Sequence, residues 1–398
     1  MTVTKQISLE DQVKKLALDE GAALVGICSV DSIKDKDFSD ANFLLPGAQS
    51  IVSIAINMDD ETVKKYLSKE DYLGLCHEEG HMTRNLLRIG DKIKELFEEK
   101  GFRAFRCNIN FNYRNVNNTS KAVIPALKNL IDLIDKEKDP NILLTQKEVK
   151  TRDRILKMVS SGFKRSPMRL VPNFSHRCAA VASGLGRVGW SGNVITEKYG
   201  ARVLFGSILT DAKLNPDKPL EINPCVNCKL CEKSCQGGLF AKDETKTIKI
   251  ADVEETIAKR NNYGYCIAIC SGMAGQNKFK EWSTWSPFRL DVDRLPLDDS
   301  ITEYVQNMYV KALEKGGKEA GIVLNQVEHT FLGRYKPVED NFRPTCSCCQ
   351  LVCGPDIKNT KESYNLLVNS GCVVQKEDGS IEILEPKEAE KNIQRDGS

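Results

Sequence analysis

Helical and extended hydrophobic patterns alternate along the first two hundred residues. Ser8 can cap a helix that carries apolar residues on one face until Gly21 ends it. Extended apolar runs occupy residues 23–30 and 50–57, and a long helical pattern covers 79–99. Further strand-like runs lie at 102–106 and 202–209. Because strands alternate with helices, the pattern predicts an α/β layered domain over residues 1–215.

Two segments interrupt this order and are interpreted as insertions. Residues 112–170 contain an apolar helix at 123–133 and a basic stretch at 147–169, with eight Lys or Arg against two acids. A single aromatic residue, Phe163, stands among these charges, so a solvated helical face is preferred to a polyanion site. A second insertion covers 271–345 within an expected domain at 216–356, and residues 357–398 are expected to form a C-terminal tail.

Composition narrows the class of protein. The 398 residues allow two or three domains, and 57 basic residues against 55 acidic ones leave no overall field for nucleic acid or membranes. No apolar run approaches the roughly 20 residues of a membrane span, and no secretory signal is visible. We therefore expect a cytoplasmic protein. Fifteen cysteines in such a chain indicate metal or redox chemistry rather than disulfides.

The first cysteine motif has the spacing C-x2-C-x2-C-x3-C, formed by Cys225, Cys228, Cys231 and Cys235. In this arrangement three thiolates ligate one 4Fe-4S cluster and the fourth reaches a second cluster. Zinc is the alternative, but its sites usually have two C-x2-C pairs separated by a longer loop. Gln236 stands where a proline usually follows the fourth cysteine.

The second motif, formed by Cys346, Cys349 and Cys353, has the spacing C-x2-C-x3-C and leaves the ligand count one short of two clusters. Cys266 and Cys270 are the candidates between the motifs. Ligand exchange assigns Cys353 to the cluster of the first three cysteines. The second cluster is then held by Cys235, Cys266, Cys346 and Cys349. The remaining cysteines are expected to be small buried residues, namely Cys28, Cys76, Cys107, Cys178, Cys270, Cys348 and Cys372.

A glycine-rich segment precedes the cysteines. Gly184, Gly186 and Gly189 match G-x-G-x-x-G, but the residues before them read as a helix rather than the strand of a dinucleotide site. Glycines this dense indicate a close approach of backbone to a ligand or to another chain segment.

These motifs in combination resemble epoxyqueuosine reductases and reductive dehalogenases. The similar residues are Ala182-Ser-Gly-Leu-Gly, Tyr199-Gly200 and Phe205-Gly206, followed by the cysteine motifs, with Leu44-Leu45-Pro46-Gly47, His81 and Arg84-Asn85 upstream. The resemblance covers roughly residues 9–110 and 170–356. It implies an α/β cobalamin-binding reductase domain followed by a ferredoxin-like domain with two 4Fe-4S clusters, and it supports Cys266 as the isolated ligand.

The resemblance also implies how the chain would work. Cobalamin would bind base-off, and its cobalt would be reduced through the nearer cluster. The cofactor-binding residues carried over are His81, Arg177, Gly184, Leu185, Gly186, Gly189, Gly200 and Gly206. For some of these side chains a structural role remains open: His81 can cap or pack its helix, and the pair His176-Arg177 can contact the corrin or substrate, or stabilise the fold. Trp282 and Trp285 can cover a flat cofactor or form the small core of their insertion.

Two features depart from the epoxyqueuosine reductases. The family has an acidic proton donor after a motif like Phe102-Arg-Ala-Phe105, whereas this chain has Arg106-Cys107-Asn108. The expected donors are therefore Cys107, Tyr113 or His176, with Tyr263 and Tyr265 as further phenols. The helical extension that grips transfer RNA is not found after Cys353, so we do not expect a transfer RNA substrate.

Two hypotheses follow. The first is an anaerobic cobalamin- and iron-sulfur-dependent oxidoreductase that cleaves a carbon–halogen or carbon–oxygen bond of a small organic substrate. Ferredoxin or flavodoxin would supply its electrons, and a homodimer is possible. The second is an iron-sulfur electron-transfer protein that reduces a partner, such as a corrinoid protein, and has no substrate of its own.

Overall fold

The computed structural model describes residues 7–36, 39–108, 119–165, 174–260, 274–287, 347–376 and 380–392, with the single positions 266, 269, 304, 307, 310, 311, 313 and 314. The chain divides into two compact units, which are described separately. The first unit comprises residues 1–109, 172–259 and 347–370, and the second comprises 110–171, 260–346 and 371–398. The sheet and both cysteine turns belong to the first unit, whereas the two expected insertions fall in the second.

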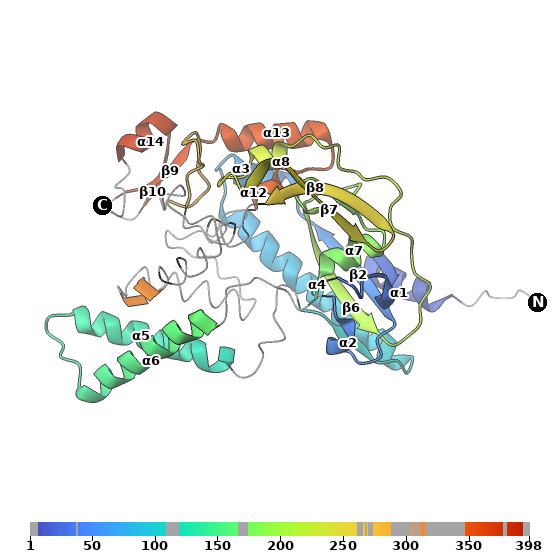
Figure 1. The fold of residues 1–398 in the computed structure, drawn as a ribbon, viewed down its shortest axis with the longest axis horizontal. Coiled ribbons are helices and arrows are strands. Elements are labelled where there is room, and N and C mark those ends of the chain that lie inside the picture. The colour runs from blue at the N-terminus through green and yellow to red at the C-terminus, as the bar shows by residue number, and fades with distance from the viewer. Residues whose placement is uncertain are drawn as a thin grey trace, which may run out of the picture. The chain divides into compact units, whose positions relative to one another are not determined.

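A four-stranded sheet forms the centre of the first unit (Figure 1). Its order is β1-β2-β6-β3, and every neighbouring pair is antiparallel. The strands are β1 (Leu24–Ser29), β2 (Ser50–Asn57), β6 (Val203–Thr210) and β3 (Ala104–Arg106). The predicted strands are thus present, but the helices between them connect antiparallel rather than parallel neighbours.

Helices cover both faces of this sheet. On one face, α1 (Leu9–Asp19) and α4 (Leu73–Glu99) pack against Val52 and Ile54 of β2 and Ile208 of β6. On the other face, α7 (His176–Ala182) packs against Ile51 and Leu209. Adjacent residues of one strand therefore serve opposite cores, because side chains alternate along an extended backbone. The result is a three-layer helix–sheet–helix unit.

The helix starts follow local capping chemistry. The backbone N–H of Asp11 donates to Ser8 Oγ at 3.1 Å, as the sequence predicts for α1. The 27-residue α4 begins six residues before the predicted start at 79 and ends at the predicted residue. The remaining short elements of this unit are η1 (Val30–Ser32), α2 (Ala41–Leu44), α3 (Asp60–Leu67), β4 (Arg187–Val188), β5 (Val194–Ile195), α8 (Leu230–Lys233), α12 (Cys348–Leu351) and α13 (Ile357–Val368).

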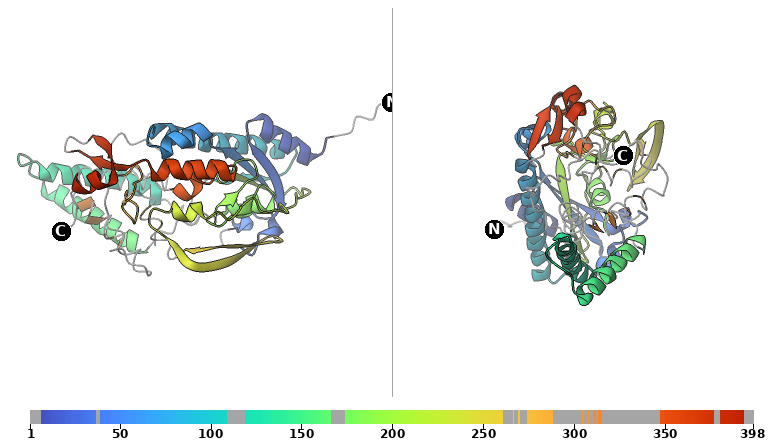
Figure 2. Two further views of the ribbon diagram at one scale, coloured as in Figure 1. Left: turned by 90° about the horizontal axis from the view of Figure 1, so that it is seen from above. Right: turned by 90° about the vertical axis from the view of Figure 1, so that its left-hand side faces the viewer.

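A hairpin that the sequence pattern does not predict lies between the two cysteine motifs. It consists of β7 (Phe240–Ile250) and β8 (Val253–Arg260), which form their own two-stranded sheet. Figure 2 shows it as a long curved ribbon. Charged residues make up nine of the 19 residues in its two strands, so hydrophobic periodicity gave little signal.

The second unit contains a helical hairpin of α5 (Thr119–Lys138) and α6 (Gln146–Arg165). Thr145 and Glu148 form a capping box at the start of α6, and this interaction lowers the pKa of Glu148 to about 2. Arg152 pairs with Glu137 of α5 and with Asp153. Part of the basic stretch is thus neutralised within the hairpin, in agreement with a solvated helical face.

The rest of this unit includes residues expected as a tail. Residues 371–392 include β9 (Cys372–Gln375), β10 (Ile381–Leu384) and α14 (Pro386–Asn392). Trp282 and Trp285 are 1 % and 6 % exposed, which favours a core role for both. His329 and Tyr335 of the same insertion lie outside the described residues. Within the described part of the chain, no helix has the length and apolarity needed to cross a bilayer.

Candidate functional site

The two cysteine motifs form two turns of the same design. Lys229 precedes α8 with φ +58°, and Ser347 precedes α12 with φ +79°. In each turn the carbonyl of this left-handed residue accepts N–H groups from the third and fourth residues after it. The left-handed residue directly follows a predicted ligand, Cys228 or Cys346, and the helical turn carries the next one, Cys231 or Cys349. The chain therefore repeats one ligand-presenting turn.

The thiols of these turns lie close enough to interact electrostatically. Cys231 is buried, and burial raises its pKa, with further increases from Cys353, Cys349, Cys225 and Cys228. Burial and Cys225 raise the pKa of Cys353 to about 12. The first predicted ligand set is thus brought together, and Cys349 of the second set lies beside it.

The surroundings of these sulfurs suit iron-sulfur clusters. The backbone N–H of Trp190 donates to Cys225 Sγ at 3.4 Å, and the N–H of Leu239 donates to Cys235 Sγ at 3.4 Å. Asn193 Nδ2 donates to Cys349 Sγ at 3.6 Å. Hydrogen bonds to sulfur are one of the means by which proteins tune such clusters.

Among the described residues, no three Cys, His, Asp or Glu side chains are arranged around a single metal ion. A tetrahedral ion needs all its ligands to converge at about 2.0–2.3 Å. In a 4Fe-4S cluster, by contrast, each thiolate ligates a different iron, so the sulfurs stand apart around the cube. The preference for clusters over zinc stays a prediction from the cysteine spacing.

The second ligand set is only partly described. Cys235 and Cys349 lie in the first unit, and Cys266 is a half-buried residue of the second. Cys346 and the alternative ligand Cys270 lie outside the described residues. This ligand set stays a prediction from spacing and resemblance.

Arg202 ties the second turn to the sheet. This side chain is 2 % exposed, and its Nε donates to the carbonyl of Leu351 at 2.7 Å. Its other nitrogens donate to Asp60 and to Ser363 Oγ. Since Arg202 directly precedes β6, one guanidinium joins the sheet, α3, α12 and α13.

The glycines expected to bind cobalamin are packed against the chain itself. A side chain at Gly186 would meet the Ile195 carbonyl at 2.5 Å. Gly200 has φ +58°, and a side chain there would meet the Gly354 carbonyl at 2.1 Å, beside the second cysteine turn. Gly184, Gly189 and Gly206 also face protein atoms, and Leu185 is buried. Close packing against the chain itself explains why these positions are glycine or buried. They do not form an open surface on which a corrin could lie.

The other two residues assigned to cobalamin are accessible. His81 is exposed on α4, and Arg177 is exposed on α7, where its Nη1 donates to the Gly192 carbonyl at 3.4 Å. The described residues thus fit cobalamin in part, because only these two side chains remain free to contact it.

The expected proton donors occupy different environments. Cys107 is buried in the core beneath α7, and burial raises its pKa. His176 Nδ1 lies 2.9 Å from Ser207 Oγ, and Nε2 lies 3.3 Å from the Asn108 carbonyl. A carbonyl can only accept, so Nε2 carries the proton and Nδ1 accepts from the serine. Burial lowers the pKa of His176 to about 4, which keeps the imidazole neutral near pH 7.

Tyr113 lies outside the described residues, as do Tyr263 and Tyr265. A neutral imidazole whose two nitrogens are both hydrogen-bonded is a weak acid. The geometry of His176 therefore favours a role in holding α7, β6 and the segment after β3 together.

A titratable group that the sequence analysis missed lies on α4. Glu79 follows Leu75 and precedes Met82 at helical spacing, on the buried side of the helix. Burial and the neighbouring Glu78 raise the pKa of Glu79 to about 7. The available signal was an acid at a position where the helical period calls for an apolar residue.

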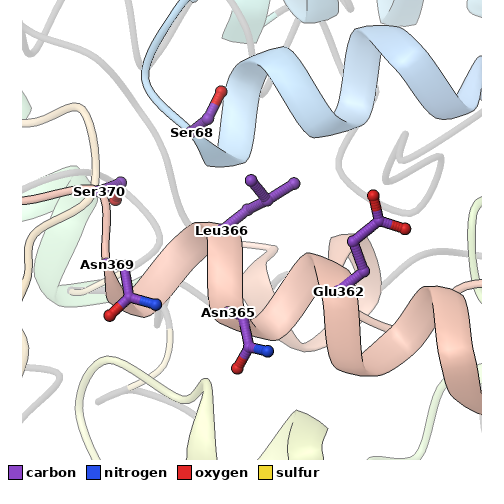
Figure 3. A pocket seen from close by; sticks show the side chains of 6 residues that line it. All are labelled: Ser68, Glu362, Asn365, Leu366, Asn369 and Ser370. Carbon is purple, nitrogen blue, oxygen red and sulfur yellow. The ribbon is translucent and has the colours of Figure 1, made fainter.

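An open pocket of about 540 Å³ lies between the end of α3 and α13. Figure 3 shows Leu366 and Glu362 of α13 directed toward α3, whose C-cap is Ser68. None of the predicted site residues lines this pocket.

No protein-family profile matches the chain. A curated relative, tetrachloroethene reductive dehalogenase from Desulfitobacterium hafniense, is 29% identical over 129 residues, covering 26% of this chain and 22% of the relative. The match therefore spans about a fifth of that protein.

Two solved structures are also similar to this chain. A reductive dehalogenase whose structure was described with a mechanism for B12-dependent dehalogenation has a TM-score of 0.39 and 13% identity, covering 84% of this chain and 40% of that one. An epoxyqueuosine reductase bound to a modified transfer RNA stem loop has a TM-score of 0.32 and 16% identity, covering 58% of this chain and 52% of that one. The resemblance predicted from the motifs is confirmed at this level: part of the chain is similar in sequence to reductive dehalogenases.

Proposed function

We propose that this protein is an iron-sulfur- and cobalamin-dependent reductase that cleaves a carbon–halogen or carbon–oxygen bond of a small organic substrate. The observation that carries the proposal is the group of neighbouring thiols at the two cysteine motifs, Cys225, Cys228, Cys231, Cys349 and Cys353. The partial sequence match to reductive dehalogenases supports the same class of enzyme. We also propose that the protein works in the cytoplasm under anaerobic conditions.

The cysteine residues would hold two 4Fe-4S clusters, in the two ligand sets predicted from spacing. The N–H groups of Trp190 and Leu239 and the amide of Asn193 stabilise thiolate charge at three of these sulfurs. Bound cobalamin, reduced through the clusters, would supply a strong nucleophile or reductant for the bond cleavage. His81 and Arg177 are the exposed side chains that would contact the cobalamin. Neutral His176 would hold α7 against β6 through its hydrogen bond with Ser207.

A second candidate function is an iron-sulfur electron carrier that reduces a partner protein. The packing of Gly184, Gly186 and Gly200 against the chain itself favours this alternative, because no open cradle is left at these positions. A transfer RNA substrate is not part of either proposal.

Cobalamin binding separates the two candidates. The chain is purified and reconstituted anaerobically with iron and sulfide, and then mixed with cobalamin and desalted. The reductase should retain about one cobalamin per chain with a base-off visible spectrum. Iron-sulfur absorbance with no retained cobalamin would establish the carrier instead.

A further inference from the structure

The first cysteine turn exposes one of its ligands. Of the described motif cysteines, Cys228 is the exposed one, whereas Cys231 is buried and the others are half-buried. Two large apolar side chains stand on the same loop, since Ile222 is 79% exposed and Val226 is 68% exposed. Exposed apolar residues around a redox ligand are typical of a surface that is covered when a partner binds.

Left-handed residues flank Cys228 in this loop. Asn227 and Lys229, on either side of Cys228, both have positive φ angles, +53° and +58°. Such angles cost about 1 kcal/mol or more for a residue with a Cβ. The Lys229 ammonium lies 4.5 Å from the centre of the Trp190 ring, and Trp190 Nε1 donates to Glu232 at 2.7 Å. The lysine is thus held beside Cys228 by a cation–π contact.

The charge of the loop is positive. Lys218, Lys229 and Lys233 are exposed, against a single exposed acid in the same stretch, Glu221. Glu232 is half-buried and engaged by Trp190, and Asp217 pairs with Lys14. An acidic partner would therefore be attracted to this loop and not repelled by it.

We propose that residues 218–233 are the docking surface for an acidic one-electron donor protein of the ferredoxin or flavodoxin class. The inference rests on the proposed function, because it needs a cluster bound by Cys228. The reduced donor loses one electron and the cluster gains it; no bond is made and no proton moves. Ile222 and Val226 form the apolar centre of the contact, and Lys229 and Lys233 form its charged rim.

The test uses the full reconstituted chain and a reduced two-cluster ferredoxin, mixed anaerobically in a stopped-flow instrument. Ile222→Asp places a negative charge in the contact, so the second-order rate of cluster reduction by ferredoxin should fall about tenfold or more. Lys229→Gln and Lys233→Gln should each weaken the salt dependence of that rate. Iron content and the rate of reduction by dithionite should stay at the wild-type values in all three variants.

Leu18→Asp is the matched control, because Leu18 is an exposed apolar residue of α1 at 51% exposure. It should leave the ferredoxin rate unchanged. An unchanged rate in Ile222→Asp would overturn the docking surface. So would a change in oligomeric state, which assigns the patch to a second copy, or a loss of bound cobalamin, which assigns it to the cofactor.

The two proposals fail in different ways. A wild-type chain that holds iron and is reduced by dithionite, but takes no electrons from ferredoxin or flavodoxin, contradicts the docking surface alone. A wild-type chain without iron contradicts the proposed function, and the docking surface with it.

Discussion

Two regions of the first unit carry the candidate chemistry, and they are built in different ways. At the cysteine turns, left-handed residues and backbone hydrogen bonds shape two similar turns, whose thiols lie close enough to interact electrostatically. Beneath α7, the side chains expected to react are already engaged: both nitrogens of His176 have protein partners, and Cys107 is in the core. The first region, called the prepared region below, is proposed to bind a cluster, and the second, called the filled region, has its polar side chains engaged by the protein itself. Reactive residue types alone do not distinguish these two regions, but the packing around each of them does.

The largest expected effect is on the prepared region. Cys231→Ser removes a ligand at the centre of the first set, so iron should fall from about eight to about four atoms per chain. Cys28→Ser is the matched control, because Cys28 is a buried thiol of the core that donates to the Ala179 carbonyl. Iron analysis of both variants after anaerobic reconstitution checks the assignment. Equal iron in the two variants would show that Cys231 is not a ligand.

The second predicted ligand set allows a similar comparison, between Cys266 and the nearby Cys270. Cys266→Ser should lose or degrade one cluster, whereas Cys270→Ser should keep both, because seven thiols come from the motifs and one more is required. Electron paramagnetic resonance of the reduced variants distinguishes one cluster from two. The reverse outcome, with Cys270 required, would replace Cys266 in the ligand set.

Arg202 links the prepared region to the sheet, and its removal should cost stability. Arg202→Met leaves the Leu351 carbonyl and Ser363 without their buried donor, so the free energy of unfolding should fall by about 3 kcal/mol. Lys15→Ala, which removes an exposed pair with Asp19, should change it by less than about 0.5 kcal/mol. Urea unfolding of the two variants compares them. A loss in Arg202→Met as small as that in Lys15→Ala would contradict the anchoring role.

The filled region should respond to pH. The folded state holds His176 neutral with a pKa of about 4, against 6.5 for the unfolded chain. The unfolded state therefore binds more protons between these values, and stability falls as pH drops from about 6.5 to about 4. His176→Gln removes this contribution, which is about 2–3 kcal/mol in full. Unfolding free energies of both proteins across this interval should converge toward low pH. Parallel curves would contradict a neutral buried imidazole.

The smallest effect compares the two turns with each other. Ser347→Gly relieves a left-handed residue and should stabilise the protein by about 1 kcal/mol. Lys229→Gly should gain a similar stabilisation by relieving its left-handed backbone. It also loses the cation–π contact with Trp190, worth about 0.5–1 kcal/mol, so the net change in the free energy of unfolding should be near zero. Denaturant unfolding measures the difference. Equal stabilisation in both variants would mean that Trp190 does not hold Lys229.

Local signals predicted much of the first unit. Hydrophobic periodicity located β1, β2, β6 and α4, and the Ser8 cap was predicted to the residue. The antiparallel pairing was not visible, because it depends on which strands meet after the chain returns from residues far away. The hairpin of β7 and β8 was missed because nine of its 19 strand residues are charged, which obscures the few apolar residues, such as Ile248, Ile250 and Val253, that pack on the core.

The sequence predicts which residues belong together where their spacing along the chain limits how they can be arranged. It does not predict residues whose role depends on tertiary packing. Cys225, Cys228 and Cys231 were grouped from their spacing, and Cys353 was added by ligand exchange; the four thiols lie near one another, and their binding of one cluster stays a prediction. The role of Gly200 could not be predicted, because it depends on the Gly354 carbonyl, which approaches from a distant part of the sequence. The raised pKa of Glu79 likewise arises from burial that only the folded chain creates.

Iron and acid-labile sulfide, counted per chain in the anaerobically reconstituted full-length protein, test the central claim most directly. Two 4Fe-4S clusters held by the seven motif cysteines and Cys266 require about eight iron and eight sulfide per chain. Four or fewer iron atoms, or zinc in their place, would contradict the account.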